Sequence, residues 1–488
     1  MGPDERELTV TNLGAIDPLG LGYFAVEWAI RIIMLVVVPF RRSPEAARGW
    51  LLLVFFLPIP ALVLYLIIGR PTYPRWRRRR FDAAQDLLAR ASREIKHSQH
   101  CCRPDLPERF LPAALLIEQL GQFPTLGSNS VEFLSDYDGM VDRLVADIEN
   151  AADHIHILMY MFADDLTGGR VVDALLRAAE RGVACRVLID ALGSRPWARR
   201  LRRRLASGGV EIERALPVTF FQRRSTRVDL RNHRKIVIID GRYGYIGSQN
   251  LIAAEFSPGL VNSELVARTS GPVVLEFQAV FVADWFLETG RVLDSPALFP
   301  HHHPRAGAVA QLLPSGPDYP ISGAERLIVA LVHGARHRIA ITTPYFIPDE
   351  ALLKALQTAV LRGVEVRLIL SRIADHPLVG LAQRSYYDEL LRAGVAIHLF
   401  DDGFLHAKHL TIDDEIAVIG SSNIDIRSFL LNGEASLIIY DRTATAGLQA
   451  EQALNIARGE RLAPEQWSQR PLLAKTVENV ARLLSPLL

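Results

Sequence analysis

The sequence predicts an α/β protein that contains a duplicated α/β domain, preceded by an N-terminal helical hairpin in a membrane. Three observations lead to this prediction: long apolar runs near the N-terminus, apolar strands that alternate with helical stretches after about residue 131, and one motif that occurs twice. With 488 residues the chain is longer than one hydrophobic core usually fills, so we expect two or more domains.

The composition is typical of a membrane protein with a globular part, because hydrophobic residues make up 49% of the chain. Lysine and arginine together number 55, and aspartate and glutamate 54. The net charge of +1 therefore gives no global electrostatic support for binding nucleic acid. The three cysteines, an odd and small number, argue against a disulfide framework and fit a reducing compartment.

Two apolar segments form the predicted hairpin. Residues 51–69 carry no charge and are long enough to span the hydrocarbon core, and Pro58 and Pro60 would kink the helix. The segment before it contains Glu27 and Arg31, a favourable helical pair four positions apart. We expect spanning helices over about 21–40 and 50–69; an interfacial helix is the alternative for the first.

Basic residues set the predicted orientation of the hairpin. Arginines cluster after the second helix, at Arg70, Arg75 and residues 77–80, whereas the connection over residues 41–50 has fewer. The positive-inside bias then places both ends of the hairpin in the cytoplasm. We therefore expect a multi-pass protein of the cell (inner) membrane with a cytoplasmic globular part. The arginine cluster would also attract anionic lipid headgroups.

From about residue 131 onward the chain repeats one order of elements. Strands are expected within residues 154–165 and 181–191, with a helix between them, and again within 337–350 and 362–371. Gly182 and Gly363 occupy equivalent helix-to-strand turns. This alternation indicates duplicated α/β units with largely buried sheets. We expect the hairpin in residues 1–70, a basic linker and helix in 71–130, and two lobes in 131–310 and 311–488.

The strongest signal is the motif H-x-K-x4-D-x6-G-S-x-N, which occurs twice. Six fixed positions match by chance at a rate on the order of 10⁻⁸ per starting position, given average residue usage. Two copies in one chain therefore indicate a duplicated function. The first copy consists of His233, Lys235, Asp240, Gly247, Ser248 and Asn250, and the second of His406, Lys408, Asp413, Gly420, Ser421 and Asn423.

The motif places ionisable side chains on one face of a strand. Residues i and i+2 of a strand point to the same side, so His233 projects with Lys235, and His406 with Lys408. The two aspartates then fall where the strand turns into the next one. The glycine and serine after that second strand would leave room for a close ligand, and the two asparagines would supply amide donors.

Two histidines and two lysines that converge on one point suit phosphoryl transfer. A neutral imidazole can attack phosphorus while a protonated one gives its proton to the leaving oxygen. The lysines, aided by the asparagines and serines, would stabilise the non-bridging oxygens without a metal ion. One H-x-K pair alone would equally well be a satisfied core pair. Two complete motifs favour the catalytic interpretation, since in-line displacement needs one imidazole on each side of phosphorus.

An acidic residue follows each motif at a similar distance: Glu264 in VNSELVAR and Glu434 in LNGEASLII. A carboxylate on the far ring nitrogen would fix the tautomer of a histidine and stabilise its imidazolium form. We expect each glutamate to orient the histidine that it follows; a surface charge is the alternative. Two further histidine-rich segments, HSQHCC at 97–102 and HHH at 301–303, match no common zinc spacing, and for the second we expect a solvated loop.

The two motifs are those of the phospholipase D superfamily, and over nearly its whole length the chain resembles the bacterial cardiolipin synthases of that superfamily. One departure is Gly433, where the resemblance leads us to expect a bulkier residue before Glu434. The segments that carry the resemblance are PIPALVLYLIIGR, RNHRKIVIIDG, DWFLETG, SGPD, TPYFIPDEALLKAL, RSYYDELLRAGVAIHLF and FLHAKHLTIDDEIAVIGSSNIDIRS.

The resemblance implies two α/β/α lobes related by a pseudo-two-fold axis, with the active site between them. It implies that two phosphatidylglycerol molecules are joined into cardiolipin with release of glycerol, without a nucleotide or a metal. His233, Lys235, His406 and Lys408 would be catalytic, and Asp240 and Asp413 mostly structural. The family usually places the nucleophile in the first motif, hence His233, although the sequence alone leaves that choice open.

Other functions remain as alternatives. The same residues would serve a phospholipase D that releases phosphatidic acid, and phosphatidylethanolamine would be an alternative second substrate. A membrane-anchored nuclease would want a basic cleft, which the net charge does not support. A non-enzymatic lipid-binding protein would have no use for paired imidazoles. The mechanism that we expect passes through a phosphatidyl-histidine intermediate.

Overall fold

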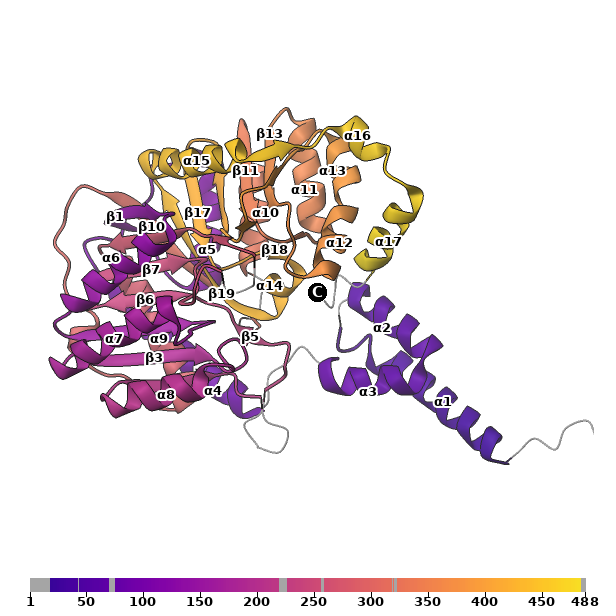
Figure 1. Cartoon of the computed structure of the whole chain (residues 1–488), viewed down its shortest axis with the longest axis horizontal. Coiled ribbons are helices and arrows are strands. Elements are labelled where there is room, and N and C mark those ends of the chain that lie inside the picture. Colours follow the sequence, from indigo (N-terminus) through magenta and orange to yellow (C-terminus); the bar gives the residue numbers. More distant parts are fainter. Residues whose placement is uncertain are drawn as a thin grey trace, which may run out of the picture. The chain divides into compact units, whose positions relative to one another are not determined.

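The computed structural model describes residues 18–42, 44–69, 75–218, 226–255, 259–317, 319 and 323–483. It divides into two compact units, residues 1–72 and residues 73–488. Arg70 of the expected basic cluster and Asp318 of the SGPD segment lie outside the described residues. Figure 1 labels the helices and strands of both units.

The described part of the first unit contains α1 (Pro18–Val37), α2 (Pro44–Phe56) and α3 (Pro58–Ile68). The three helices share a small apolar core in which the rings of Trp50 and Tyr65 meet edge to face. The expected pair of Glu27 and Arg31 is confirmed, with an ion pair of 3.2 Å. Arg31 also donates from Nε to the carbonyl of Phe55, which ties α1 to α2.

The second apolar segment, which we expected to be one kinked helix over residues 50–69, is divided into the two helices α2 and α3. The helix breaks at Leu57, whose φ of −133° and ψ of 67° are not helical. The cause is Pro58, which lacks an amide proton and disfavours the α conformation of the residue before it. Among the described residues, Gly20–Val37 is the one helical segment long and apolar enough to cross a membrane, and Ala46–Phe56 and Pro58–Ile67 are shorter apolar helices.

The second unit is built on a large mixed sheet of 16 strands. The strands of its main path run in the order β20-β14-β13-β11-β16-β17-β19-β10-β1-β9-β7-β6-β2-β3-β4. Their bounds, in chain order, are β1 (Leu126–Leu134), β2 (His154–Met159), β3 (Ala184–Asp190), β4 (Glu211–Ala215), β6 (Ile236–Ile239), β7 (Tyr243–Gly247), β9 (Val266–Ser270), β10 (Ala308–Ser315), β11 (Arg338–Thr343), β13 (Glu365–Ser371), β14 (Ala396–Phe400), β16 (His409–Ile412), β17 (Ile416–Gly420), β19 (Asn432–Tyr440) and β20 (Gly459–Arg461).

The same connections occur on both sides of the central β1–β10 pair. On one side β2, β3 and β4 are parallel and β2 pairs antiparallel with β6; on the other side β11, β13 and β14 are parallel and β11 pairs antiparallel with β16. The strands expected from the sequence repeat are therefore present in both halves. Gly182 and Gly363 have φ values of 91° and 84°, as the equivalent turns require.

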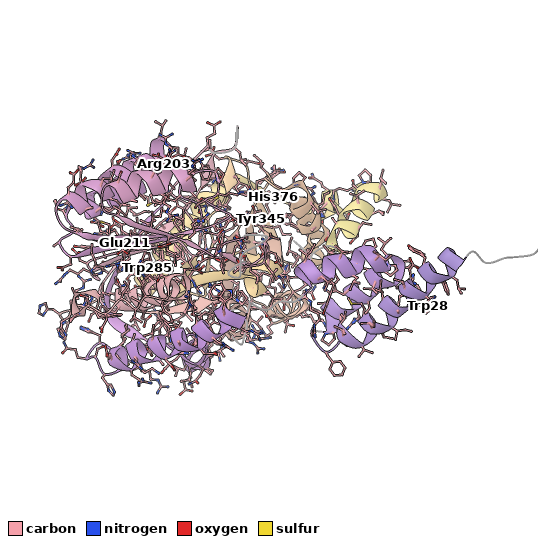
Figure 2. The ribbon with its side chains drawn as sticks, turned by 90° about the horizontal axis from the view of Figure 1, so that it is seen from below. Trp28, Arg203, Glu211, Trp285, Tyr345 and His376 are labelled. Atoms are coloured by element: carbon pink, nitrogen blue, oxygen red, sulfur yellow. The ribbon has the colours of Figure 1, made fainter. Side chains whose placement is uncertain are left out.

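Helices cover both faces of the sheet. In β6, Val237 and Ile239 pack with α6 and α7, whereas Ile236 and Ile238 face α9, because side chains alternate along a strand. Trp285 on α9 lies inside the unit, whereas Arg203 on α8 lies on its outside (Figure 2). The helices are α6 (Tyr137–Glu149), α7 (Leu166–Glu180), α8 (Ala198–Ser207) and α9 (Val274–Thr289) in the first half, and α10 (Gly323–Gly334), α11 (Glu350–Leu361), α12 (Pro377–Ser385), α13 (Tyr387–Ala393), α14 (Ile426–Leu430) and α15 (Arg442–Ala457) in the second.

Part of the arginine cluster is used in packing. Helix α4 (Arg75–Lys96) lies against α9, while α5 (Leu111–Gly121) packs against β10 and α10. Arg77 is buried and forms an ion pair with Glu288, and Arg80 donates to the carbonyls of Leu287 and Glu288 at the end of α9. Two of the arginines expected to attract lipid are thus committed to this contact, which leaves residues 78 and 79 exposed.

Candidate active site

Each motif begins directly after a short strand that pairs with a strand from the other half of the chain, so residues 233–235 and 406–408 lie between strands and not within the strand that we expected. Strand β5 (Arg231–Asn232) lies parallel to the start of β19, and β15 (Phe404–Leu405) lies parallel to β8 (Asn262–Ser263). The amide of His233 donates to the carbonyl of Gly433, and the amide of His406 to the carbonyl of Ser263, both at 2.8 Å. Each histidine therefore enters the site beside the residue that precedes the glutamate of the other repeat.

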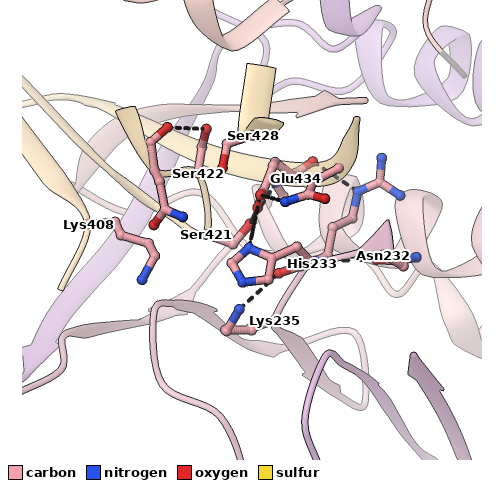
Figure 3. Close-up of polar contacts among 12 residues, drawn as sticks. Asn232, His233, Lys235, Lys408, Ser421, Ser422, Ser428 and Glu434 are labelled. Carbon is pink, nitrogen blue, oxygen red and sulfur yellow. Dashed lines mark hydrogen bonds and ion pairs between the residues drawn. The ribbon is translucent and has the colours of Figure 1, made fainter. Parts of the chain in front are cut away.

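As a result, each glutamate contacts the histidine of the other repeat. His233 donates from Nδ1 to Glu434, with 2.9 Å to Oε1 and 3.1 Å to Oε2 (Figure 3). His406 donates from Nδ1 to Oε1 of Glu264 at 2.7 Å. The expectation that each glutamate orients the histidine it follows was wrong, because the crossed strand pairing brings the opposite carboxylate closer. Within the described residues, the Nε2 atom of neither imidazole has a hydrogen-bond partner.

The two lysines are placed in the same way in both motifs. Lys235 donates from Nζ to the carbonyl of His233 at 3.0 Å, and Lys408 to that of His406 at 2.6 Å. Both lysines are buried, and Figure 3 shows Lys235 and Lys408 on the open side of the His233 ring. The ring of Tyr160 lies 4.8 Å from the His233 ring and 5.4 Å from the Lys235 ammonium.

Burial lowers the pKa of all four motif bases, and the charges of neighbouring bases lower it further at His233, His406 and Lys408. Burial is the main cause for both lysines, and it brings the pKa of Lys235 to about 8 and that of Lys408 to about 7. The pKa of His233 lies well below its usual value through burial and the charges of Lys235, Lys408 and His406. Burial also lowers the pKa of His406, against the opposing effect of Glu264. These mutual influences show that the two motifs share one region, suited to an anionic ligand.

The two orienting carboxylates differ in charge. Burial of Glu264 favours its neutral form, but the charge of His406 and its hydrogen bond outweigh burial and lower the pKa of Glu264. Burial dominates at Glu434 and raises its pKa to about 7. Glu264 is therefore ionised beside His406 at neutral pH, whereas Glu434 stands near its midpoint beside a neutral His233.

The serines and glycines of the motifs have structural partners. The Ser421 hydroxyl donates to Glu434 at 2.5 Å, and Ser248 bonds both backbone groups of Leu265, so the serines support the glutamates and the neighbouring strand instead of the expected phosphate oxygens. A Cβ on Gly247 or Gly420 would lie 2.3 or 2.2 Å from a carbonyl oxygen of that strand. The glycines thus permit close strand pairing, and the expectation that they make room for a ligand was wrong.

Among the described residues, the two asparagines keep unpartnered polar atoms near the site, a donor at Asn250 and an acceptor at Asn423. Oδ1 of Asn250 accepts from the amide of Met161 at 3.2 Å, and in the described part of the chain its NH₂ group has no hydrogen-bond partner. The side-chain oxygen of Asn423 is buried and has no partner within the same ranges. Both amides therefore retain hydrogen-bonding capacity that a ligand can use.

The two motif aspartates lie at the far ends of their strands. Asp240 accepts from the amides of Ala152, Asp153 and His154, and has a φ of 53°. Asp413 has a φ of 51° and accepts from the amides of residues 336–338 and from Arg109. Seven residues separate each aspartate from its histidine, a span of roughly 20 Å along an extended strand. These contacts fit the structural role expected for them and place them away from the imidazoles.

Arg234, which stands between His233 and Lys235, was not singled out by the sequence. Its guanidinium donates to Asp284 at 2.6 Å, to the carbonyl of Glu434 at 2.9 Å and to the carbonyl of Ser315 at 3.0 Å. Asn232 also donates to Asp284, at 3.0 Å. Arg234 and Asp284 lie in two of the segments that carry the family resemblance, RNHRKIVIIDG and DWFLETG. This resemblance is the feature of the sequence from which the two residues could have been identified.

The two histidine-rich segments contact each other outside this site. The ring of His100 donates from Nε2 to the carbonyl of His302 at 2.9 Å, and His302 bonds the carbonyl of Gly241 at 3.1 Å. Within the described ranges, no group of three or more histidine, cysteine, aspartate or glutamate side chains is arranged to hold a metal ion. These histidines therefore have packing partners near the turn that follows β6.

A mixed α/β sheet that brings two H-x-K-x4-D motifs to one site defines the phospholipase D class of proteins. Residues 144–285 and 328–453 match the family described as "Cardiolipin synthase, PLD-like domain", and residues 29–70 match "Phospholipase_D-nuclease N-terminal". The chain therefore belongs to the cardiolipin synthase family with phospholipase D-like domains.

Individual relatives agree with this assignment. The chain is 35% identical to cardiolipin synthase A of Serratia proteamaculans (strain 568) over 457 residues, 92% of this chain and 94% of that protein. It is 34% identical to cardiolipin synthase A of Yersinia pestis over 477 residues, 96% of this chain and 98% of that protein. The crystal structure of phosphatidylserine synthase from Haemophilus influenzae Rd KW20 has the same fold, with a TM-score of 0.58, 16% identity, and coverage of 77% of this chain and 100% of that one.

Proposed function

We propose that this protein is a membrane-bound phosphatidyltransferase that condenses two phosphatidylglycerol molecules to cardiolipin and glycerol. The observation that carries the proposal is the pair of crossed histidine–glutamate contacts beside two lysines. These contacts fix both Nδ1 atoms, and among the described residues neither Nε2 atom has a hydrogen-bond partner. Two such imidazoles supply a nucleophile and a general acid on opposite sides of one phosphorus. The membership of the cardiolipin synthase family supports this reaction.

His233 is the nucleophile in this mechanism. Its depressed pKa keeps the ring neutral, and its hydrogen bond to Glu434 directs the lone pair to Nε2. His406 is the general acid, since the ionised Glu264 stabilises its protonated form. The negative charge of a bound phosphodiester raises the pKa of His406 from this lowered value and favours the proton that the first step needs.

The first step transfers the phosphatidyl group to the enzyme. Nε2 of His233 attacks the phosphorus of the first phosphatidylglycerol, and the bond from phosphorus to the headgroup oxygen breaks. That oxygen takes the proton from Nε2 of His406, and glycerol leaves. A phosphatidyl-histidine remains, with the charge of the substituted ring offset by Glu434.

The second step regenerates both histidines. Nε2 of His406, now neutral, takes a proton from the headgroup hydroxyl of a second phosphatidylglycerol. The oxygen attacks phosphorus, the phosphorus–nitrogen bond to His233 breaks, and cardiolipin leaves. One phosphodiester replaces another, so the reaction needs no nucleotide. Lys235 and Lys408, with the NH₂ group of Asn250, stabilise the non-bridging oxygens in both transition states.

We assign the two repeats, residues 131–310 and 311–488, to two α/β/α lobes related by a pseudo-two-fold axis. The matching strand order on both sides of the β1–β10 pair supports this division. Residues 1–70 are the membrane hairpin of a multi-pass inner-membrane protein with cytoplasmic lobes, and residues 71–130 join hairpin and lobes. The apolar α1 and the exposed residues 78 and 79, which would meet anionic headgroups, support the membrane placement.

Product analysis tests the proposal. The purified full-length protein is reconstituted into phosphatidylglycerol vesicles, and lipids and soluble products are measured by mass spectrometry. We expect cardiolipin and glycerol in equal amounts, and a loss of both in His233→Ala and His406→Ala. Phosphatidic acid as the main product would identify a hydrolase, and a fully active variant of either histidine would contradict the two-histidine mechanism.

A further inference from the structure

Helix α17 (Leu472–Arg482), near the end of the described chain, is amphipathic, but its two faces are oriented opposite to those of an ordinary surface helix. It packs against α12 (Figure 1). On most soluble proteins the apolar face of such a helix is buried and its charged face meets water. In α17 the charged side chains face the protein and the large apolar side chains face outward.

The inward face of α17 is held by ion pairs. Glu478 is buried and accepts from Arg470 at 2.8 Å and from Arg384 at 3.1 Å. Lys475 donates to the carbonyl of Ser468 at 2.6 Å, and the guanidinium of Arg482 lies 4.0 Å from the centre of the Tyr386 ring. These contacts fix the rotation of the helix, so the apolar face cannot turn inward without breaking them.

The outward face of α17 is largely apolar, and Thr476 and Asn479 are exposed polar residues on it. Leu473, Val477 and Val480 follow the i, i+4, i+7 spacing of one helix face, and Leu472 and Leu483 extend it at the two ends. Their exposed fractions range from 45% to 81%. Monomeric soluble proteins rarely expose a contiguous patch of this kind, which usually marks a protein or membrane contact.

We propose that this face of α17 lies in the surface layer of the lipid bilayer and is a second membrane contact of the protein. The bilayer is the apolar phase that every copy meets, because α1 is long and apolar enough to cross it. The five side chains are aliphatic, without the tyrosine, tryptophan or arginine that protein interfaces favour. A helix of this length with one apolar face is suited to lie in the plane of a membrane surface.

The position of α17 connects this contact to the catalytic region. Helix α12, on which α17 packs, follows the loop of Asp375, whose carboxylate accepts from the Tyr345 hydroxyl and whose charge acts on Lys408. Tyr345 and His376 mark this region in Figure 2. Ile373 and Leu378, on the same loop and helix, are also exposed apolar residues. A bilayer against α17 would therefore lie close to the loop of Asp375 and so to the catalytic region, an inference that rests on the proposed function.

Fluorescence quenching in proteoliposomes tests the proposal on the full-length protein. In a background with Cys101→Ser and Cys102→Ser, the variant Val480→Cys is labelled with bimane, and Leu361→Cys on α11 serves as the matched control because its site is 85% exposed and isolated. Vesicles contain phosphatidylglycerol and phosphatidylcholine, with a nitroxide-labelled lipid as the membrane quencher and iodide as the aqueous one.

We expect the label at position 480 to lose fluorescence with the nitroxide lipid and to resist iodide, and the label at 361 to do the reverse. Quenching at 480 by iodide alone would show that the face lies in water and would overturn the proposal. Protection from both quenchers would show that protein covers it, either this chain's N-terminal helices or a second copy, and would overturn it as well. Because no turnover is measured, the result also holds in His233→Ala and is independent of whether the proposed reaction is right.

Discussion

Glu434 accepts a hydrogen bond from Nδ1 of His233, a residue 201 positions before it in the chain. The second contact of this kind, from His406 to Glu264, joins residues 142 positions apart. Each oriented histidine is thus assembled from both repeats. A single repeat would contain a histidine and a lysine but no carboxylate in place to orient the ring, so the duplication supplies more than a second imidazole.

The crossed contacts predict that Glu434→Gln and Glu264→Gln each reduce turnover by about 10²-fold or more, because an amide neither fixes the tautomer nor balances the charge of its histidine. The measurement is the initial rate of cardiolipin formation in phosphatidylglycerol vesicles. Glu465→Gln, an exposed glutamate in α16 (Pro464–Ser468), is the control and should match the wild type. Near-normal turnover in either site variant would show that the contacts are dispensable.

The depressed lysine pKa values predict an alkaline limit on activity. Lys235 titrates at about 8 and Lys408 at about 7 in the free protein, so the charges that stabilise the phosphate are lost as the pH rises through this range. The profile of kcat/KM, which reports the free enzyme, should fall above about pH 7 to 8. The profile of kcat should extend to higher pH, because bound phosphate raises both values. A kcat/KM that stays constant up to pH 9 would contradict this assignment.

The burial of Lys408 predicts that this residue lowers the stability of the fold although turnover requires it. Its folded pKa of about 7 lies below the ordinary 10.5, so the folded state loses its proton first, and the wild type gains stability as the pH rises between these values. Lys408→Met should therefore abolish turnover and raise the thermal midpoint at pH 6, with a smaller difference at pH 9. Lys354→Met, at an exposed lysine on α11, is the control. A lower midpoint at pH 6 would contradict the cost of burying this charge.

The sequence predicted the local parts of this structure and missed those that depend on how the halves meet. The strands near His154 and Arg338 and the turns at Gly182 and Gly363 follow from periodicity and glycine placement, which act over a few residues. The crossed contacts of Glu264 and Glu434 depend on strands β5 and β8. Each of these strands has two residues, which is too short for a pattern of apolar and polar residues to be detected.

For the motif residues, too, the sequence predicted local features and missed contacts with other strands. Their types and spacing were enough to identify the chemistry of His233 and His406, although residues 233–235 and 406–408 lie between two strands and not within the strand that we expected. The spacing could not show that Ser421 faces Glu434 or that Gly420 permits close strand pairing, since both partners come from another strand. The sequence predicted a kink at Pro58, and the structure has a full break at Leu57, because Pro58 restricts the residue before it.

Asp413 offers a test of a structural role within the catalytic motif. Burial disfavours its charge, but the amides of His337 and Arg338 and the side chain of Arg109 outweigh burial and lower its pKa below the ordinary 3.8. Its contribution to stability is therefore complete above that value and is lost as the pH falls through the folded pKa. Asp413→Asn should lower the free energy of unfolding at pH 7 by about 1–3 kcal/mol.

Urea denaturation in detergent, from pH 7 down to pH 3, checks this prediction. The difference between Asp413→Asn and the wild type should shrink toward the acid end, because the unfolded chain takes up a proton at Asp413 before the folded protein does. Turnover per folded molecule should remain close to wild type below the denaturation range, since the aspartate lies away from the imidazoles. A large loss of turnover in a stably folded variant would assign Asp413 to the chemistry instead.

The buried pair of Arg234 and Asp284 predicts a coupling between the stability of the fold and the alignment of His233. Removing one partner leaves an uncompensated buried charge, so Arg234→Met and Asp284→Leu should each destabilise the fold by about 3–5 kcal/mol. The double variant should recover much of that loss, because both charges are absent and the site stays filled.

We expect the variants of Arg234 and Asp284 to change turnover and stability differently. Arg234 also donates to the carbonyl of Glu434, and no apolar side chain can replace that bond. The double variant should therefore fold well and still show a reduced kcat with little change in KM, because the carboxylate that orients His233 is less firmly held. Arg234→Lys should behave similarly, since a lysine keeps the charge toward Asp284 but cannot reach three acceptors in one plane. If the double variant recovered both stability and kcat, Arg234 would serve the fold alone.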